Sequence, residues 1–160
     1  MSQSTASLRI FGDDLVPKKV SLLIGGQPTR WYCKGDIKPL ESGKQVVRKT
    51  GMWLRAVKER EPEDLDSQIA ELFSGLTSDL NIWQTLSTQF DVSIFTGFFM
   101  DKTNTGFCLS PETTNILSNR NIKIHFDIYS PDTEIIATDK CPCESGKTYA
   151  ECCSLKSTVA

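Results

Sequence analysis

The sequence predicts an α+β fold, in which a sheet of about five strands is covered by helices packed mainly on one face. Segments of alternating apolar residues, typical of strands, are interspersed with segments whose apolar residues repeat at helical spacing. No glycine-rich turn of the kind that binds a dinucleotide joins a strand to a helix. With 160 residues, of which 39% are apolar, the chain suits one ordinary domain and a small appendage.

The first part of the chain is expected to supply three strands and one helix. Pro17 fits the first position of the helix, and Gly25 fits its end, because proline has no N–H to lose there and glycine accepts the left-handed backbone conformation. The expected elements are a strand over 8–11 ending at Gly12, the helix from Pro17 to Gly25, a short strand between turns within 28–36, a loop or irregular hairpin over 37–50, and a strand over 51–57.

The second part is expected to alternate helices with two long strands. Residues 92–100 become apolar on both faces, which is typical of a strand buried in mid-sheet, whereas 122–129 alternates. The alternation predicts that the isoleucines and Phe126 face the core, and that Lys123, His125, Asp127 and Tyr129 face outward. The helices are expected over 65–76 after the acidic start at 61–64, over 80–90, and from Pro111 with Ser110 as its cap.

Charge and hydropathy narrow the expected compartment and partners. The net charge is −2 and the sequence pI is about 5.4, so no global basic field attracts a nucleic acid, and nucleic-acid binding is not expected. No stretch approaches the roughly 18 apolar residues of a membrane span, and the polar residues 1–7 lack a secretory signal. We therefore expect a cytoplasmic protein without a membrane segment, whose clustered thiols favour metal binding or redox chemistry over structural disulfides.

Four of the six cysteines lie in one short segment, Cys141, Cys143, Cys152 and Cys153. A zinc ion needs about four ligands at tetrahedral corners, and two tight turns facing each other can supply them. Ser145 and Gly146 allow the chain to reverse between the two cysteine pairs. The alternatives are a reduced tail without metal or a pair of disulfides. A closed site with four cysteines leaves no open position for water, so catalysis at the metal is not expected.

The same segment, Cys-x-Cys, eight residues and Cys-Cys, with Ser-Gly-Lys and a tyrosine between, resembles the SEC-C motif. This is the zinc-binding module at the carboxyl end of the bacterial preprotein-translocase motor ATPase. The resemblance implies that Cys141, Cys143, Cys152 and Cys153 are all ligands and that the module docks on the export chaperone or the ribosome. Glu144 stands where the family usually has glycine, and this departure argues against docking on the chaperone without affecting the metal site.

The larger part carries a set of segments in a fixed order: 8–14, 28–30 with 34–36, 51–54, 104–112 and 126–129. In that order they resemble a bacterial family known only as domain of unknown function 4279, and the resemblance implies no activity. The expected organisation is a flexible N-terminus at 1–6, an α+β domain at 7–129, a linker at 130–138, the zinc knuckle at 139–155 and a tail at 156–160.

Six charged residues stand at predicted strand ends or on a polar face, and their convergence would make a polar pocket. The alternative is ordinary turn chemistry and surface ion pairs. These residues are Asp13, Asp14, Arg30, Lys34, Asp36 and Asp127. The two other cysteines, Cys33 and Cys108, are expected to be buried and inert thiols.

The leading hypothesis is a non-enzymatic cytosolic adaptor or binding protein. In it, the zinc knuckle is a protein-docking module and the α+β domain recognises a macromolecule. One alternative is a small enzyme or ligand-binding domain that uses the polar pocket around Arg30 and Asp127, and another is an immunity-type inhibitor with a flat, charged face. The sequence leaves the oligomeric state open.

Overall fold

The computed structural model describes residues 1–131, 138, 140–141, 145–148 and 150–152. The chain divides into two units, Met1–Ser130 and Pro131–Ala160. The first unit contains strands β1 (Gln3–Gly12), β2 (Arg30–Tyr32), β3 (Ile37–Pro39), β4 (Gln45–Val47), β5 (Gly51–Ala56), β6 (Asp91–Phe99) and β7 (Lys123–Tyr129), and helices α1 (Pro17–Ile24), α2 (Leu65–Phe73), α3 (Leu80–Gln89) and α4 (Pro111–Asn119).

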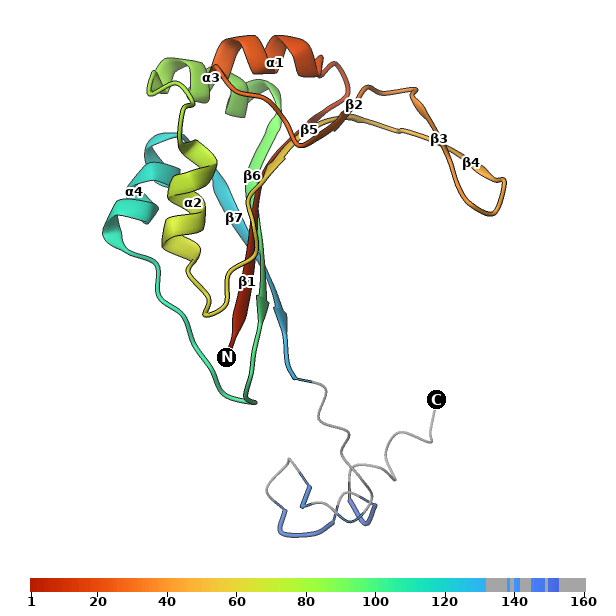
Figure 1. Cartoon of the computed structure of the whole chain (residues 1–160), viewed down its shortest axis with the longest axis vertical. Coiled ribbons are helices and arrows are strands. Elements are labelled where there is room, and N and C mark those ends of the chain that lie inside the picture. The colour runs from red at the N-terminus through yellow and green to blue at the C-terminus, as the bar shows by residue number, and fades with distance from the viewer. Residues whose placement is uncertain (132–137, 139, 142–144, 149, 153–160) are drawn as a thin grey trace. The chain divides into compact units, whose positions relative to one another are not determined.

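The first unit is built on a five-stranded sheet with the order β2-β5-β1-β6-β7, while β3 and β4 form a separate hairpin (Figure 1). Neighbouring strands are antiparallel except for β6 and β7, which are parallel and are connected through α4. The helices cover one side of the sheet in Figure 1. This arrangement confirms the predicted α+β class and the predicted number of strands in the main sheet.

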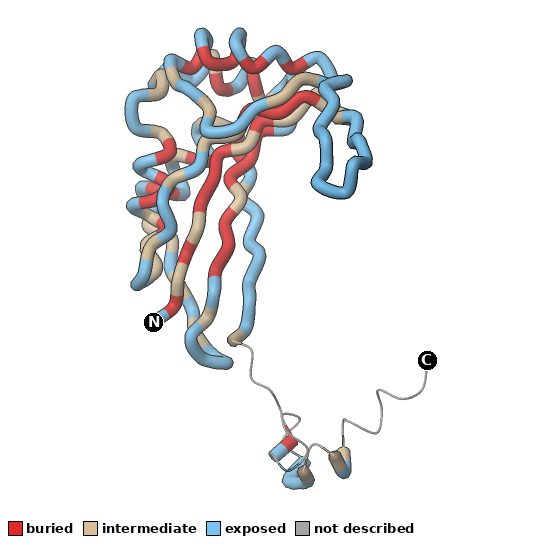
Figure 2. Tube along the Cα trace, turned by 45° about the vertical axis from the view of Figure 1, so that its right-hand side comes forward, coloured by how far each residue is buried: buried red, intermediate tan, exposed pale blue. Residues whose placement is uncertain are grey.

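The core lies between the sheet and the helices. Leu8 on β1, Trp53 on β5 and Ile94 on β6 are fully buried there, together with Ile69 on α2 and Trp83 on α3. Burial of each such side chain contributes roughly 1.5–3 kcal/mol relative to its exposure. Figure 2 shows that buried residues concentrate in the central strands and on the inner faces of the helices. The opposite face of the sheet carries no helix among the described residues.

Two helix starts form as the sequence predicts. Ser110 accepts a hydrogen bond from the N–H of Thr113 at 3.1 Å, with Pro111 in the first turn of α4. Asp64 accepts from the N–H of Ser67 at 3.0 Å at the start of α2. In the described part of the chain, no helix is both long enough and apolar enough to cross a membrane.

The amino-terminal residues differ from the prediction of a flexible segment at 1–6. β1 begins at Gln3, which pairs with Phe99, and the side chains of Ser4 and Ala6 are buried. The polar composition concealed the strand, because small serine and threonine side chains can be buried when hydrogen bonds satisfy their hydroxyls. Most of the predicted linker at 130–138 lies outside the described residues.

The outer strand β7 is more exposed than predicted. Ile124 is half-buried against the core, but Phe126 is 36% exposed and Ile128 is 58% exposed. Both side chains are on the helix-covered side by alternation, and Phe126 contacts Phe107 with ring centroids 5.0 Å apart. The prediction that they face the core was therefore right about the side of the sheet and wrong about burial, because β7 is an edge strand that the helices only partly cover.

Candidate functional site

Two of the four predicted zinc ligands, Cys141 and Cys152, lie in the described residues, and Cys141 belongs to a small hairpin. Lys140 and Thr148 form an antiparallel bridge, and the N–H of Cys141 donates to the carbonyl of Lys147 at 2.9 Å. Gly146, with φ of 75°, supplies the left-handed residue that the reversal requires. Cys141 is 4% exposed. The predicted turn between the cysteine pairs is therefore present.

A serine hydroxyl ties the second cysteine to this turn. The Oγ of Ser145 donates to the Sγ of Cys152 at 3.3 Å. The loop before Cys152 is fixed by Glu151, whose carboxylate accepts from the N–H and the hydroxyl of Thr148 at 3.3 and 2.8 Å. A hydroxyl that donates to a sulfur is the kind of outer contact that stabilises a metal-bound thiolate. The thiol donors and this contact fit a zinc ion.

The other two predicted ligands, Cys143 and Cys153, lie outside the described residues. Within the described ranges, no group of three or more histidine, cysteine or acidic side chains is placed to hold a metal ion. Zinc at this site is therefore taken up below as a proposal. The remaining cysteines are far from the tail in sequence. Cys33 is half-buried and Cys108 is exposed, so the expectation of a buried thiol is wrong for Cys108.

The six residues of the predicted polar pocket do not gather in one place. Arg30 lies on β2 and Asp127 on β7, the two opposite edges of the sheet. Three strands separate them, so the strands that carry them are roughly 19 Å apart at about 4.8 Å per neighbouring pair. Asp36 stabilises its own turn, because its carboxylate accepts a hydrogen bond from the N–H of Cys33 at 2.8 Å. This is the turn chemistry that the sequence left as the alternative.

Only Asp13 and Lys34 of the six form an ion pair in the described residues. The Nζ of Lys34 donates to the Oδ2 of Asp13 at 2.6 Å, and both side chains are more than half exposed. That hydrogen bond, and then the charge of Lys34, lower the pKa of Asp13, while the same bond raises the pKa of Lys34. Asp14 adds a weaker attraction to Lys34. Exposed pairs of this kind contribute little to stability, so the cluster resembles a surface contact more than a catalytic site.

Replacement of Lys34 by methionine is expected to raise the pKa of Asp13 toward 3.8, its ordinary value. The folded-state pKa lies below the unfolded value, so the stabilisation by this pair is present above the unfolded pKa and is lost as the pH falls through the folded pKa. A pH titration of the Asp13 carboxyl carbon by NMR measures the shift, with Lys38→Met on the β3–β4 hairpin as the control. A pKa that is the same in the native protein and in the Lys34→Met variant would contradict the geometry.

The uncovered face of the sheet carries a shallow groove with a volume of about 620 Å³. Arg9, Arg30, Leu54 and Phe95 are among the residues that line it. The guanidinium of Arg9 lies 3.6 Å from the centre of the Phe95 ring, and its Nε donates to the hydroxyl of Ser7 at 3.1 Å. These two contacts fix one positive charge on an aromatic surface.

On this face, the charge of Arg9 on β1 interacts with that of Asp127 on β7. Burial lowers the pKa of Arg9, and the carboxylate of Asp127 partly opposes that effect. Farther along the sheet, the rings of Phe99 and Tyr129 stack with centroids 4.7 Å apart. Arg9, Phe95 and Phe99 are not among the site residues that the sequence predicts. The available signal was the two-residue period of a strand, which places Arg9 on the face opposite Leu8 and Ile10, and Phe95 and Phe99 on the face opposite Ile94.

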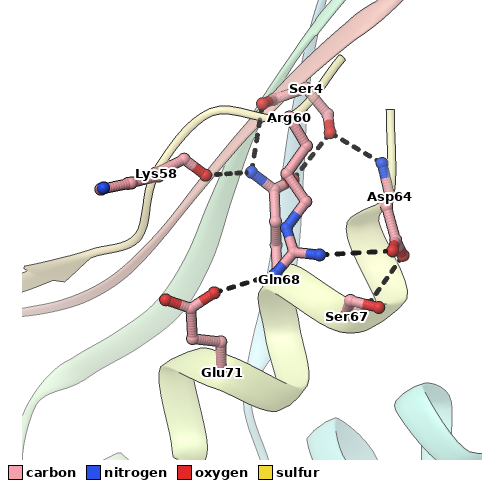
Figure 3. Close-up of polar contacts among 7 residues, drawn as sticks. All are labelled: Ser4, Lys58, Arg60, Asp64, Ser67, Gln68 and Glu71. Atoms are coloured by element: carbon pink, nitrogen blue, oxygen red, sulfur yellow. Dashed lines mark hydrogen bonds and ion pairs between the residues drawn. The ribbon is translucent and has the colours of Figure 1, made fainter. Parts of the chain in front are cut away.

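A buried polar network joins β1 to α2 and to the loop between β5 and α2 (Figure 3). Gln68 is fully buried, and its amide donates to the carbonyls of Ser4 and Lys58 at 3.1 and 2.8 Å. Its carbonyl accepts from the hydroxyl of Ser4 at 2.7 Å, and that hydroxyl accepts from the N–H of Asp64. Arg60 lies above, paired with Asp64 and Glu71. Every polar atom of the Gln68 amide thus has a protein partner, which is typical of a structural network.

Comparisons with known proteins agree with this division. A family model described as a domain of unknown function (DUF4279) matches residues 2–131. A second model, for the SEC-C motif, matches residues 138–155. No curated protein and no solved structure matches the chain significantly.

Proposed function

The chain belongs to the DUF4279 family, with a SEC-C motif after the family domain, and from that premise we propose that it is a non-enzymatic zinc-dependent adaptor. In this proposal the SEC-C motif is a protein-docking module, and the α+β domain recognises a second macromolecule through the uncovered face of its sheet. The observation that carries the proposal is the hairpin over 140–148 that contains Cys141, together with the Ser145 hydroxyl in its turn that donates to the sulfur of Cys152.

Zinc in this module would be held by Cys141, Cys143, Cys152 and Cys153. The ion would supply the stability that so short a segment cannot obtain from an apolar core. Cys141 and Cys152 provide thiolates, the Ser145 hydroxyl donates to one of them, and the backbone of Lys147 holds the turn. With four sulfur ligands the ion has no open position, which supports a docking role over catalysis.

The uncovered sheet face supports the second half of the proposal. Arg9 and Arg30 line its groove together with apolar Leu54 and the ring of Phe95, so the surface combines positive charge with aromatic and apolar contact area. Arginine and aromatic residues are enriched where proteins recognise partners. The separation of Arg30 from Asp127 across the sheet favours such a surface over a catalytic pocket that uses both residues. We expect a partner with acidic side chains at this face.

Affinity capture with three full-length baits and one truncation tests the adaptor. The baits are the native chain, Cys141→Ser, and Arg30→Glu, and the truncation ends at Thr138. We expect one set of partners to be lost with both Cys141→Ser and the truncation, and a different set to be lost only with Arg30→Glu. Lys38→Glu is the matched charge control for Arg30→Glu.

Two results of the capture experiment would contradict the adaptor role. If all baits retain the same proteins, neither the metal module nor the sheet face selects a partner. If the native chain retains nothing beyond the empty matrix, docking fails as the function. Thermal unfolding of each bait, followed by the fluorescence of the buried Trp53 and Trp83, verifies that a lost partner does not reflect a lost fold.

A further inference from the structure

Strand β7 forms one edge of the sheet and pairs with β6 alone among the described strands. Its side chains are largely accessible, with Phe126 36%, Ile128 58% and Tyr129 47% exposed. Figure 2 shows the exposed residues continuing along this strand. A long, accessible edge with apolar side chains is a template for pairing with another strand.

The backbone of β7 presents alternate residues to this open edge. The carbonyl of Tyr129 accepts from the N–H of Met100 at 2.9 Å, and the carbonyl of His125 accepts from the Thr96 hydroxyl at 2.9 Å. Thr96 lies in β6 and Met100 follows it directly. The backbone groups of His125 and Tyr129 therefore point toward β6 and away from the open edge. Successive residues of a strand alternate, and the backbone groups of the even-numbered residues 124, 126 and 128 therefore turn outward.

The sequence of β7 is nearly symmetric about Phe126. One residue away on either side are His125 and Asp127, and two residues away are Ile124 and Ile128. We propose that the chain forms a two-fold dimer in which β7 pairs antiparallel with β7 of a second copy, with Phe126 opposite Phe126. In this register His125 lies opposite Asp127 of the second copy, and Ile124 lies opposite Ile128.

The backbone orientation favours the same register. Phe126 exchanges N–H···O bonds with its symmetry mate, and the isoleucine pairs do so as well. His125 and Asp127 then occupy the pairs without backbone bonds, where the Cα atoms are only about 4.5 Å apart and side chains approach most closely. Charges on an edge strand normally prevent pairing, but here each carboxylate lies opposite an imidazole, whose ring N–H is a hydrogen-bond donor to it.

Other centres of symmetry fit less well. A two-fold axis at His125 places two histidines opposite each other, and one at Asp127 places two carboxylates there. Only the centre at Phe126 pairs all residues of Lys123–Tyr129 with one another. On the face that carries the pairs of His125 with Asp127, Arg9 attracts Asp127, and Lys123 pairs with Asp91 at 2.8 Å. A single added strand pair is a small interface, so the dimer is weak and concentration-dependent.

Sedimentation velocity of the full-length chain in a non-thiol reductant tests the dimer. We expect a monomer–dimer equilibrium with a dissociation constant below about 1 mM. His125→Asp places two carboxylates opposite one another twice per dimer and is expected to weaken association about tenfold or more. Asp127→Lys removes the carboxylate opposite His125 and is expected to weaken association less. In a mixture of the two variants, a heterodimer pairs the introduced aspartate with the introduced lysine and keeps one native pair of His125 with Asp127, so heterodimers should form. Glu41→Lys is the charge control and should associate as the native chain does.

A proline variant tests the backbone bonds separately. Ile128→Pro removes an N–H that faces the open edge, so the monomer should fold while association is lost. Ile128→Ala removes the same side chain and retains the N–H, and it should associate more strongly than Ile128→Pro. A chain that stays monomeric at about 1 mM would overturn the proposal. A dimer that is indifferent to the two charge variants and to Ile128→Pro would overturn it as well.

Discussion

Replacement of Cys141 or Cys152 by serine is expected to abolish stoichiometric zinc binding while the unit Met1–Ser130 stays folded. Loss of an outer hydrogen bond at a metal site typically weakens binding about 10- to 100-fold, and loss of a ligand should cost more. Ser145 donates to the sulfur of Cys152, so Ser145→Ala should give the smaller effect and the serine variants the larger one. Competition with a chromogenic chelator measures both affinities.

The controls for this prediction are the two cysteines outside the tail. Cys33→Ser and Cys108→Ser should keep the zinc affinity of the native chain, because neither belongs to the proposed site. An unchanged affinity in both Cys141→Ser and Cys152→Ser would remove these residues from the ligand set. A drop in the Cys33→Ser or Cys108→Ser variant would place the metal elsewhere.

Replacement of Gln68 by leucine is expected to lower the free energy of unfolding by about 3 kcal/mol, because buried partners would lose their hydrogen bonds. Leucine is close to glutamine in volume, so the loss reports the hydrogen bonds more than a cavity. The carbonyl of Lys58 and the hydroxyl of Ser4 would lose their bonds to the amide (Figure 3). Urea unfolding followed by the fluorescence of Trp53 and Trp83 measures the change.

An exposed glutamine provides the matched control. Gln84 lies on the solvent side of α3, so Gln84→Leu should change the free energy of unfolding by less than about 0.5 kcal/mol. A Gln68→Leu variant as stable as the native chain would show that the network is not needed to hold α2 and the preceding loop on β1. Equal losses in both variants would attribute the effect to leucine itself.

Local patterns predicted most of the elements but not their neighbours in the sheet. The alternation in 122–129 and the apolar run in 92–100 predicted β7 and β6, because side-chain period reflects the two faces of a strand. The start of β1 escaped prediction, since its serines are buried through partners more than 50 residues away, such as Gln68. Hydrogen bonds between distant residues leave no periodic signal.

For the candidate site, too, the features that depend on residues close in sequence were predictable, and those that depend on strand order were not. The spacing of the tail cysteines predicted a metal motif, because ligands close in sequence impose their own geometry, and the SEC-C match agrees. The polar pocket failed because Arg30 and Asp127 are at opposite edges, and strand order is set by long-range pairing. The cation–π contact of Arg9 with Phe95 also depends on that order, since it joins β1 to β6.

The zinc content of the untagged, full-length chain tests the central claim most directly. Elemental analysis is expected to find about one zinc per chain, and chelation should release it while the far-UV circular dichroism of the α+β domain is retained. Near-zero metal together with four titratable thiols in the tail would contradict a zinc-dependent adaptor. Loss of the domain's far-UV signal on chelation would contradict its independence from the metal.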